Sequence, residues 1–356
     1  MRRLRRHRLR HAVSAGSVAL LCAPLLLGLT AQPAAALSII PNFDSTITSD
    51  PNAAAIEAAI TLALSPYAMF SDPVTVNILY QASHAGTSSY LGESGSAFYQ
   101  NSYAAYTGAL ATDAASYGNS VEQSGVTHLS SGNVAQSVLA TAADLRALGC
   151  GGCAGTISSI NLSNNTLVTG GSYDGAIAIN LSQPLQFSRN ANGTINGGFY
   201  DAISVIQHET DEVLGIGGSG SILNDVGSGS TPPSIGGQTT IGALDLFRYS
   251  AAGTPSLTTS GSASSYFSLD GGTTHIASFN QSSNGDFGDW LVGTGHVQDA
   301  FTPSGQVANV SATSPEGLAL QAIGYDVPEP ASLALLAVGA AFVTGLRRRP
   351  RRRIAA

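Results

Sequence analysis

The chain has 356 residues, of which 15 are basic and 22 acidic, so its formal charge at pH 7 is −7. Twelve of the basic residues are arginines in the first ten or last ten positions, which leaves three arginines, no lysine and 21 acidic side chains between residues 37 and 326. This segment lacks the positive surface that holds a nucleic-acid backbone, so nucleic acid is excluded as a partner. Its acidity suits a soluble exported protein that attracts cations.

The N-terminus has the pattern of a secretory signal. Six arginines in the first ten residues precede an apolar run over 18–29, and the small residues Ala34, Ala35 and Ala36 follow it. This order of charge, apolar run and small residues is typical of a signal peptide. We assign residues 1–36 to it, with cleavage after Ala36.

Residues 37–326 are predicted to form one domain, because no charge run or proline-rich linker divides them. Helical and strand patterns occur in this segment without regular alternation, which favours an α+β fold with a small mixed sheet. A loop rich in glycine, serine and proline is expected at 217–237. Helices are predicted at 53–64, 97–117, 134–148, 201–214 and 315–323, and strands at 74–80, 175–181, 185–187, 244–249 and 265–269.

Two cysteines remain after removal of the signal peptide, and they form a Cys-x-x-Cys motif at Cys150 and Cys153. In the oxidising environment outside the cytoplasm this spacing predicts a tight local disulfide. A zinc site would need two further ligands, and none is adjacent.

The segment from His208 to Glu212 is the most informative motif of the chain. In H-E-x-x-H metalloproteases two imidazoles four residues apart hold zinc, and the intervening Glu polarises the attacking water. Here Glu209 is that Glu, and Glu212 stands at the second imidazole position, where a carboxylate oxygen is also a zinc ligand. Asp201 is expected to cap the helix and Gly215 to end it. The alternative interpretation is an ion-paired helix face.

A catalytic zinc needs three protein ligands, so one more must be found. In the metzincin pattern H-E-x-x-H-x-x-G-x-x-H the glycine corresponds to Gly215, but the third histidine position falls on Gly218, which has no side chain. Both methionines of the chain, Met1 and Met69, lie upstream, so the methionine turn of metzincins is also missing. The third ligand must therefore come from elsewhere in the chain.

The C-terminus carries a tail in three parts. Pro328, Glu329 and Pro330 precede an apolar stretch over 331–346, and a cluster of six arginines follows. This layout resembles the PEP-CTERM sorting signal, so we assign residues 327–356 to it. The resemblance implies processing by an exosortase-type enzyme, a transient membrane anchor, and a final location at the cell surface or outside the cell. The alternative is a simple membrane helix, for which the stretch is short.

The segment between the two tails resembles a family of bacterial PEP-CTERM-bearing metalloproteases with the signature H-E-x-x-E-x-x-G. The matching stretches cover 42–44, 70–78, 208–215, 244–250, 266–272, 285–290 and 319–326. Related exported zincins with H-E-x-x-H carry a Ser-His-Trp whose histidine is a distant third ligand, and Gly288-Asp289-Trp290 occupies that place here. The resemblance therefore implies a zincin-like domain with an active-site helix and the metal ligands His208, Glu212 and Asp289.

Other third ligands remain open on chemical grounds. His296 and His275 offer imidazoles, and Asp245 offers another carboxylate. The Asp/Gly segment 284–289 also has the composition of a solvated or calcium-binding turn. One imidazole and two carboxylates make a harder site than three imidazoles, so zinc is expected, with manganese or iron as alternatives.

The sequence thus predicts an exported zinc-dependent endopeptidase that acts on protein or peptide substrates with Glu209 as general base. One alternative is a surface or matrix protein in which metal serves stability alone, and another is a metal-dependent hydrolase such as a cell-wall amidase. In zincin folds a peptide can add to an edge strand beside the cleft, and residues 175–179 are the candidate for that strand.

Overall fold

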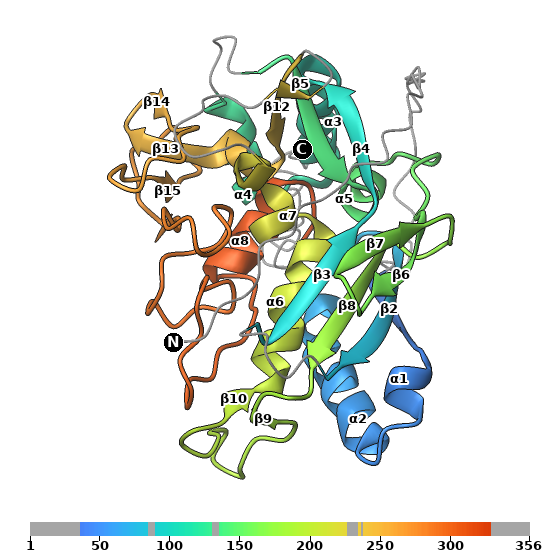
Figure 1. Cartoon of the computed structure of the whole chain (residues 1–356). Helices are drawn as coiled ribbons and strands as arrows, with labels where there is room; N and C mark the ends of the chain where they lie inside the picture. Colours follow the sequence, from blue (N-terminus) through green and yellow to red (C-terminus); the bar gives the residue numbers. More distant parts are fainter. Residues whose placement is uncertain (1–35, 85–89, 130–134, 226–233, 236–237, 329–356) are drawn as a thin grey trace, which may run out of the picture.

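The computed structural model describes residues 36–84, 90–129, 135–225, 234–235 and 238–328. They form a mixed α+β fold in which helix α6 runs through the middle of the molecule (Figure 1). This confirms the predicted fold class, while the predicted signal peptide up to Ala35 and the apolar tail lie outside the described residues. The α-helices are α1 (Ser45–Thr48), α2 (Ala53–Leu64), α3 (Tyr103–Tyr117), α4 (Ser120–Thr127), α5 (Ala142–Ala147), α6 (Ala202–Leu214), α7 (Gly217–Gly220) and α8 (Pro315–Ala322), and the 3₁₀ helices are η1 (Ser65–Met69), η2 (Leu223–Asp225) and η3 (Leu244–Phe247).

Side-chain caps explain where the predicted helices begin. Asp201 precedes α6 and accepts a hydrogen bond from the backbone of Ser204 at 3.3 Å. Ser314 precedes α8 in the same way, with Pro315 at the first helical position. These caps satisfy backbone donors that a helix leaves unpaired at its start. The helices predicted at 53–64, 201–214 and 315–323 are confirmed to within one residue, the last two with these caps and the first without a side-chain cap.

The largest mixed sheet lies beside α6. Its strand order is β1-β2-β8-β3; β1, β2 and β8 are parallel and β3 pairs antiparallel with β8 (Figure 1). The strands are β1 (Ser38–Phe43), β2 (Thr75–Ser83), β3 (Gly92–Ser96) and β8 (Gly175–Asn180). The predicted strands at 74–80 and 175–181 are therefore both present.

Strand β8 is covered on both faces. Ile177 and Ile179 belong to the main core with residues of α6, whereas Ala176 and Ala178 pack with Leu167 of the hairpin β6 (Ile157–Asn161) to β7 (Thr166–Thr169). Burial on both faces accounts for an uninterrupted apolar strand. The prediction that 175–179 forms the edge of the sheet is wrong. Among the described residues β3 holds the edge next to α6.

A second four-stranded sheet contains the first residues of two predicted helices, so these two predictions are wrong in part. It contains β4 (Phe98–Ser102), β5 (Ser137–Thr141), β12 (Gln238–Gly242) and β11 (Ser234–Ile235). Residues 98–102 and 137–141 are strands, and helices α3 and α5 begin only after them. Ser102 accepts from the backbone of Ala105, and Thr141 from that of Asp144. These caps mark the true starts, and pairing of β4 with β5 overrides the helical pattern before them.

The C-terminal half contains short strands joined by long loops. Residues 244–249 were predicted as a strand, but they begin as the 3₁₀ helix η3. The Asp245 carboxylate accepts hydrogen bonds from the backbone of Gly242 and from the Ser221 hydroxyl, and these bonds bend the chain into a turn. The predicted strand at 265–269 is present at its centre. The remaining strands are β9 (Leu185–Gln186), β10 (Tyr200–Asp201), β13 (Arg248–Ala251), β14 (Thr254–Pro255), β15 (Tyr266–Phe267) and β16 (Ala277–Ser278).

The predicted disulfide between Cys150 and Cys153 is confirmed, with an S–S distance of 2.01 Å. Changing both cysteines to serine is expected to lower the free energy of unfolding by at most about 2 kcal/mol, because so short a loop loses little chain entropy. Urea denaturation of the purified variant checks this value. A loss well above it would mean that the bridge supports tertiary contacts beyond its own loop.

Candidate metal centre

Helix α6 carries the H-E-x-x-E motif and is buried along its whole length. One side packs on β3 and β8, and the other on the loops between residues 280 and 310 (Figure 1). Ser204 Oγ accepts from the backbone of Ala308 at 2.9 Å, and Gln207 Oε1 accepts from the backbone of Val310 at 3.2 Å. These bonds hold the C-terminal loops against the same helix that carries the motif.

His208, Glu212 and Asp289 meet at one point in the protein interior. Their nearest ligand atoms all lie within 4.8 Å of one another. His208 Nε2 is 3.8 Å from Glu212 Oε1 and 3.8 Å from Asp289 Oδ2. Neighbouring ligands of a tetrahedral zinc ion are roughly 3.4 Å apart. The structure thus brings together the three side chains that the family resemblance implies as ligands.

The His208 ring is oriented by its other nitrogen. Nδ1 lies 3.0 Å from the carbonyl oxygen of Val297, which can only accept, so Nδ1 carries the proton. Nε2 is then left with a lone pair, which accepts from the Gln298 amide at 3.1 Å. Burial lowers the pKa of His208 to about 4, so the imidazole is neutral at pH 7. A neutral ring held by a carbonyl is the arrangement that metal-binding histidines use.

Glu212 is held by two donors. Its carboxylate accepts from the hydroxyl of Ser94 on β3 and from the backbone N–H of Gly218 at 3.0 Å. Burial raises its pKa to about 7, and these two hydrogen bonds oppose the rise. A Cβ atom at Gly218 would lie 2.6 Å from Glu212 Oε1. The position that supplies a histidine in metzincins therefore supplies a backbone donor here.

Glu209 lies against the edge strand, and its side chain is 2% exposed. A Cβ atom at Gly92 would lie 2.8 Å from Glu209 Oε1, so the glycine leaves room for the carboxyl group. Burial raises the pKa of Glu209, and the charges of Glu212 and Asp289 raise it further. A carboxyl group at the reacting centre can serve as general base and then as general acid.

Gln298 is a member of the cluster that the sequence did not reveal. Its Nε2 lies 3.1 Å from His208 Nε2 and 3.0 Å from Asp289 Oδ1, so the amide donates to both. Its Oε1 is buried without a hydrogen-bond partner. A cation held by His208 Nε2 and Asp289 Oδ2 would replace the first of these hydrogen bonds and leave the second in place. No local motif marks a glutamine nine residues after an aspartate, so only the folded chain could identify it.

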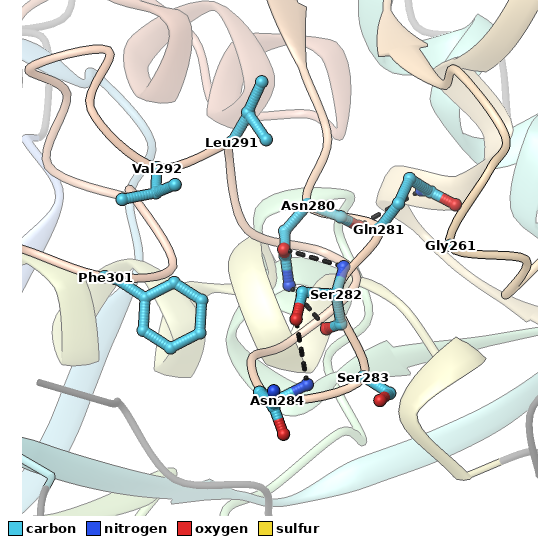
Figure 2. Close-up of a pocket in the computed structure, with 9 residues that line it drawn as sticks. All are labelled: Gly261, Asn280, Gln281, Ser282, Ser283, Asn284, Leu291, Val292 and Phe301. Atoms are coloured by element: carbon cyan, nitrogen blue, oxygen red, sulfur yellow. Dashed lines mark hydrogen bonds between the residues drawn. The ribbon is translucent and has the colours of Figure 1, made fainter. Parts of the chain in front are cut away.

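The loop that carries Asp289 is organised by Asn280. The Asn280 side chain donates to the carbonyls of Ser282 at 3.0 Å and of Asp286 at 2.9 Å and accepts from the backbone of Ser282 at 3.0 Å, as Figure 2 shows in part. The Asn280 backbone donates to the carbonyl of Asp289 at 2.8 Å. These bonds fix the turn from which the Asp289 side chain enters the cluster.

An open pocket borders this loop but does not contain the cluster (Figure 2). No titratable side chain lines it, so it has no group for acid–base chemistry or for tight metal binding. Its lining residues are Gly261, Asn280, Gln281, Ser282, Ser283, Asn284, Leu291, Val292 and Phe301.

Trp290 anchors the other end of the loop. Its side chain is fully buried and packs on the rings of Phe267 and Phe279, with centroids 5.7 and 5.1 Å away. The indole nitrogen donates to Glu316 of α8 at 3.1 Å, and the same carboxylate oxygen accepts from the backbone of Gln298 at 3.1 Å. Glu316 thereby joins the loop of Asp289 to that of Gln298.

The other candidate ligands lie outside the group formed around His208 among the described residues. Asp245 is buried in its own turn, where it accepts several hydrogen bonds. His275 is exposed and stacks on Tyr266 with centroids 4.5 Å apart. His296 is half-buried in the loop before Val297.

The charge of the cluster fits a cation. His208, Glu212 and Asp289 are 2%, 6% and 0% exposed, and Asp289 Oδ2 has no hydrogen-bond partner. The three arginines of the described chain contact other groups: Arg146 pairs with Asp174, Arg189 with Asp201, and Arg248 lies over the ring of Phe279. Because buried carboxylates require a compensating positive charge, these residues fit a divalent metal.

Comparison with known proteins identifies the end of the chain. Residues 326–349 match the family model of the PEP-CTERM protein-sorting motif. No metalloprotease family is detected, no curated protein matches, and no solved structure matches, so the zincin-like part of the fold prediction is not confirmed. Within the described residues no helix is long and apolar enough to cross a membrane, and the predicted anchor at 331–346 lies outside them.

The sorting motif defines the class of protein. The chain is exported, processed by an exosortase and anchored at the cell surface, as its tail predicts.

Proposed function

We propose that this surface protein is a zincin-like metal-dependent peptidase whose metal is held by His208, Glu212 and Asp289. The observation that carries the proposal is the convergence of one neutral imidazole and two carboxylates on one point. Glu209 lies on the same helix as His208 and Glu212. Imidazole nitrogen and carboxylate oxygen are both zinc ligands, and an adjacent carboxyl group can act as the general base for a metal-activated water. Protein or peptide chains are the proposed substrates.

Glu209 is the proposed general base. A divalent metal, when bound, would polarise the carbonyl of the scissile bond and lower the pKa of an attacking water. Glu209 would take the proton from this water and return it to the leaving amine. Ser94 and Gly218 would keep Glu212 in place, and the carbonyl of Val297 would keep His208 in its tautomer.

Zinc is the leading metal because its ligands in proteins include imidazole and carboxylate groups. Manganese or iron are the alternatives, since two carboxylates make the site harder and more anionic. Strand β3 is the proposed place for an extended substrate, because it holds the edge of the sheet and supplies both Ser94 and Gly92.

A second function is favoured by the burial of the site. Glu209 and all three ligand residues are no more than 6% exposed, so a substrate reaches them only if the surrounding loops move. A metal held without turnover would instead stabilise a surface or matrix protein. Wild-type protein that retains metal but cleaves neither proteins, peptides nor peptidoglycan would support this second function.

Changing His208 to alanine is expected to lower metal affinity by more than about 100-fold, because it removes the only imidazole of the cluster. The content of zinc, manganese and iron after dialysis, measured by mass spectrometry and normalised to folded protein, checks this result. His275→Ala is the matched control, since it removes an exposed imidazole and should keep full metal content. Unchanged metal content in His208→Ala would end the proposal.

A further inference from the structure

A second group of carboxylates lies between α3, α4 and the segment that follows α8. Asp113, Glu122 and Asp326 each turn a carboxylate oxygen toward the others, and these atoms all lie within 4.8 Å of one another. The side chains are 7%, 0% and 2% exposed. The group shares no residue with the cluster around His208.

The backbone holds the three residues in place. Asn119 caps α4 through its side-chain oxygen, and Glu122 lies in the first turn of that helix. The Asn119 amide also donates to the carbonyl of Tyr325 at 3.3 Å, and the Tyr325 hydroxyl donates to Leu214 at the end of α6 at 2.9 Å. These contacts bring the segment that contains Asp326 to the start of α4.

The Glu122 side chain points to a missing ligand. It is fully buried, and neither carboxylate oxygen has a hydrogen-bond partner. Asp113 Oδ2 is also buried without a partner. Burial, together with the charges of Asp113 and Asp326, raises the pKa of Glu122 to about 10. An unpaired buried carboxylate costs several kcal/mol in a protein interior, and the arginines of the described chain contact other groups.

We propose that Asp113, Glu122 and Asp326 bind a calcium ion. The donors are all carboxylate oxygens, which hard cations prefer, with neither imidazole nor thiolate to favour zinc. Calcium–oxygen distances of roughly 2.3–2.6 Å allow ligand oxygens up to about 5 Å apart, so three oxygens within 4.8 Å of one another can share one ion. Exported proteins also meet free calcium at the concentrations that extracellular calcium sites require.

The calcium ion would connect the folded domain to its sorting tail. Asp326 is the first residue of the matched sorting motif. Its backbone N–H donates to Asp72 at 2.9 Å, so the segment already contacts the region that precedes β2. Calcium would add α3 and α4 to these contacts and hold the point at which the tail leaves the domain.

Calcium titration of the purified full-length protein, first stripped of metal with EDTA, tests the site. Saturating calcium is expected to raise Tm by about 5 °C or more. Calorimetry should show one calcium ion bound by the cluster of Asp113, Glu122 and Asp326. Glu122→Gln should lose both the binding heat and the rise in Tm. Asp113→Asn is a second variant that should show the same loss if Glu122→Gln does not fold. Glu57→Gln, at a half-buried position on α2, is the matched control and should keep the full rise.

The His208→Ala variant separates the two sites. It should keep the calcium-dependent rise in Tm, because its substitution lies in the other cluster. No binding of calcium by wild-type protein at millimolar concentration, or an unchanged response in Glu122→Gln or Asp113→Asn, would overturn the proposal. Neither result bears on peptidase activity.

Discussion

Changing Glu209 to glutamine is expected to lower kcat for peptide hydrolysis by about 10²–10⁴-fold while metal content stays at the wild-type value. Glutamine has nearly the same shape as glutamate and fits the space beside Gly92, but it cannot accept a proton from water. The ligands His208, Glu212 and Asp289 are unchanged. Initial rates on an unfolded protein substrate, measured beside metal content, check both parts.

Two comparisons make this result specific. Glu57→Gln, which makes the same chemical change on α2 at a half-buried position, should retain full activity. Full turnover in Glu209→Gln would exclude Glu209 as general base. Metal-replete wild-type protein without any hydrolysis would instead favour the surface protein in which metal serves stability.

Changing Trp290 to alanine is expected to lower the free energy of unfolding by about 3–5 kcal/mol, because it removes a large, fully buried side chain. The substitution leaves a cavity against Phe267 and Phe279 and takes one donor from Glu316. Since Trp290 follows Asp289 directly, metal affinity should fall as well. Guanidinium denaturation and metal titration measure the two effects.

The neighbouring Leu291 provides the control for this prediction. Its side chain is 44% exposed, so Leu291→Ala should change stability by no more than about 0.5 kcal/mol. Equal losses in the two variants would mean that Trp290 does not anchor the loop. A large loss of stability without any change in metal affinity would mean that the loop keeps Asp289 in place without the indole.

The helices that could be predicted have their signals within a few residues of one another. Asp201 and Gly215 enclose the motif helix, and Ser314 with Pro315 starts the last one, so local physics was sufficient. Residues 98–102 and 137–141 were predicted as helix because alanine and other helix formers follow them. They are strands because each is the other's partner, and such pairing cannot be recognised in either segment alone.

The edge strand β3 could not be recognised from its own residues either. Residues 92–96, Gly-Glu-Ser-Gly-Ser, have no strand pattern, yet they form β3 because β8 offers an unpaired edge beside α6. The apolar strand 175–179 has the stronger strand pattern and lies inside the sheet. An uninterrupted apolar run indicates burial on two faces, which β8 has between α6 and the β6–β7 hairpin.

The sequence by itself determined the export signal and sorting tail as patterns, the disulfide, and the placement of His208, Glu209 and Glu212 on one helix. Each depends on residues close together in the chain, where spacing alone decides which side chains share a face. Only the tertiary structure brought Asp289 and Gln298 to that helix and collected Asp113, Glu122 and Asp326 from three segments. Contacts between distant segments depend on how the core packs, and no single segment carries that information.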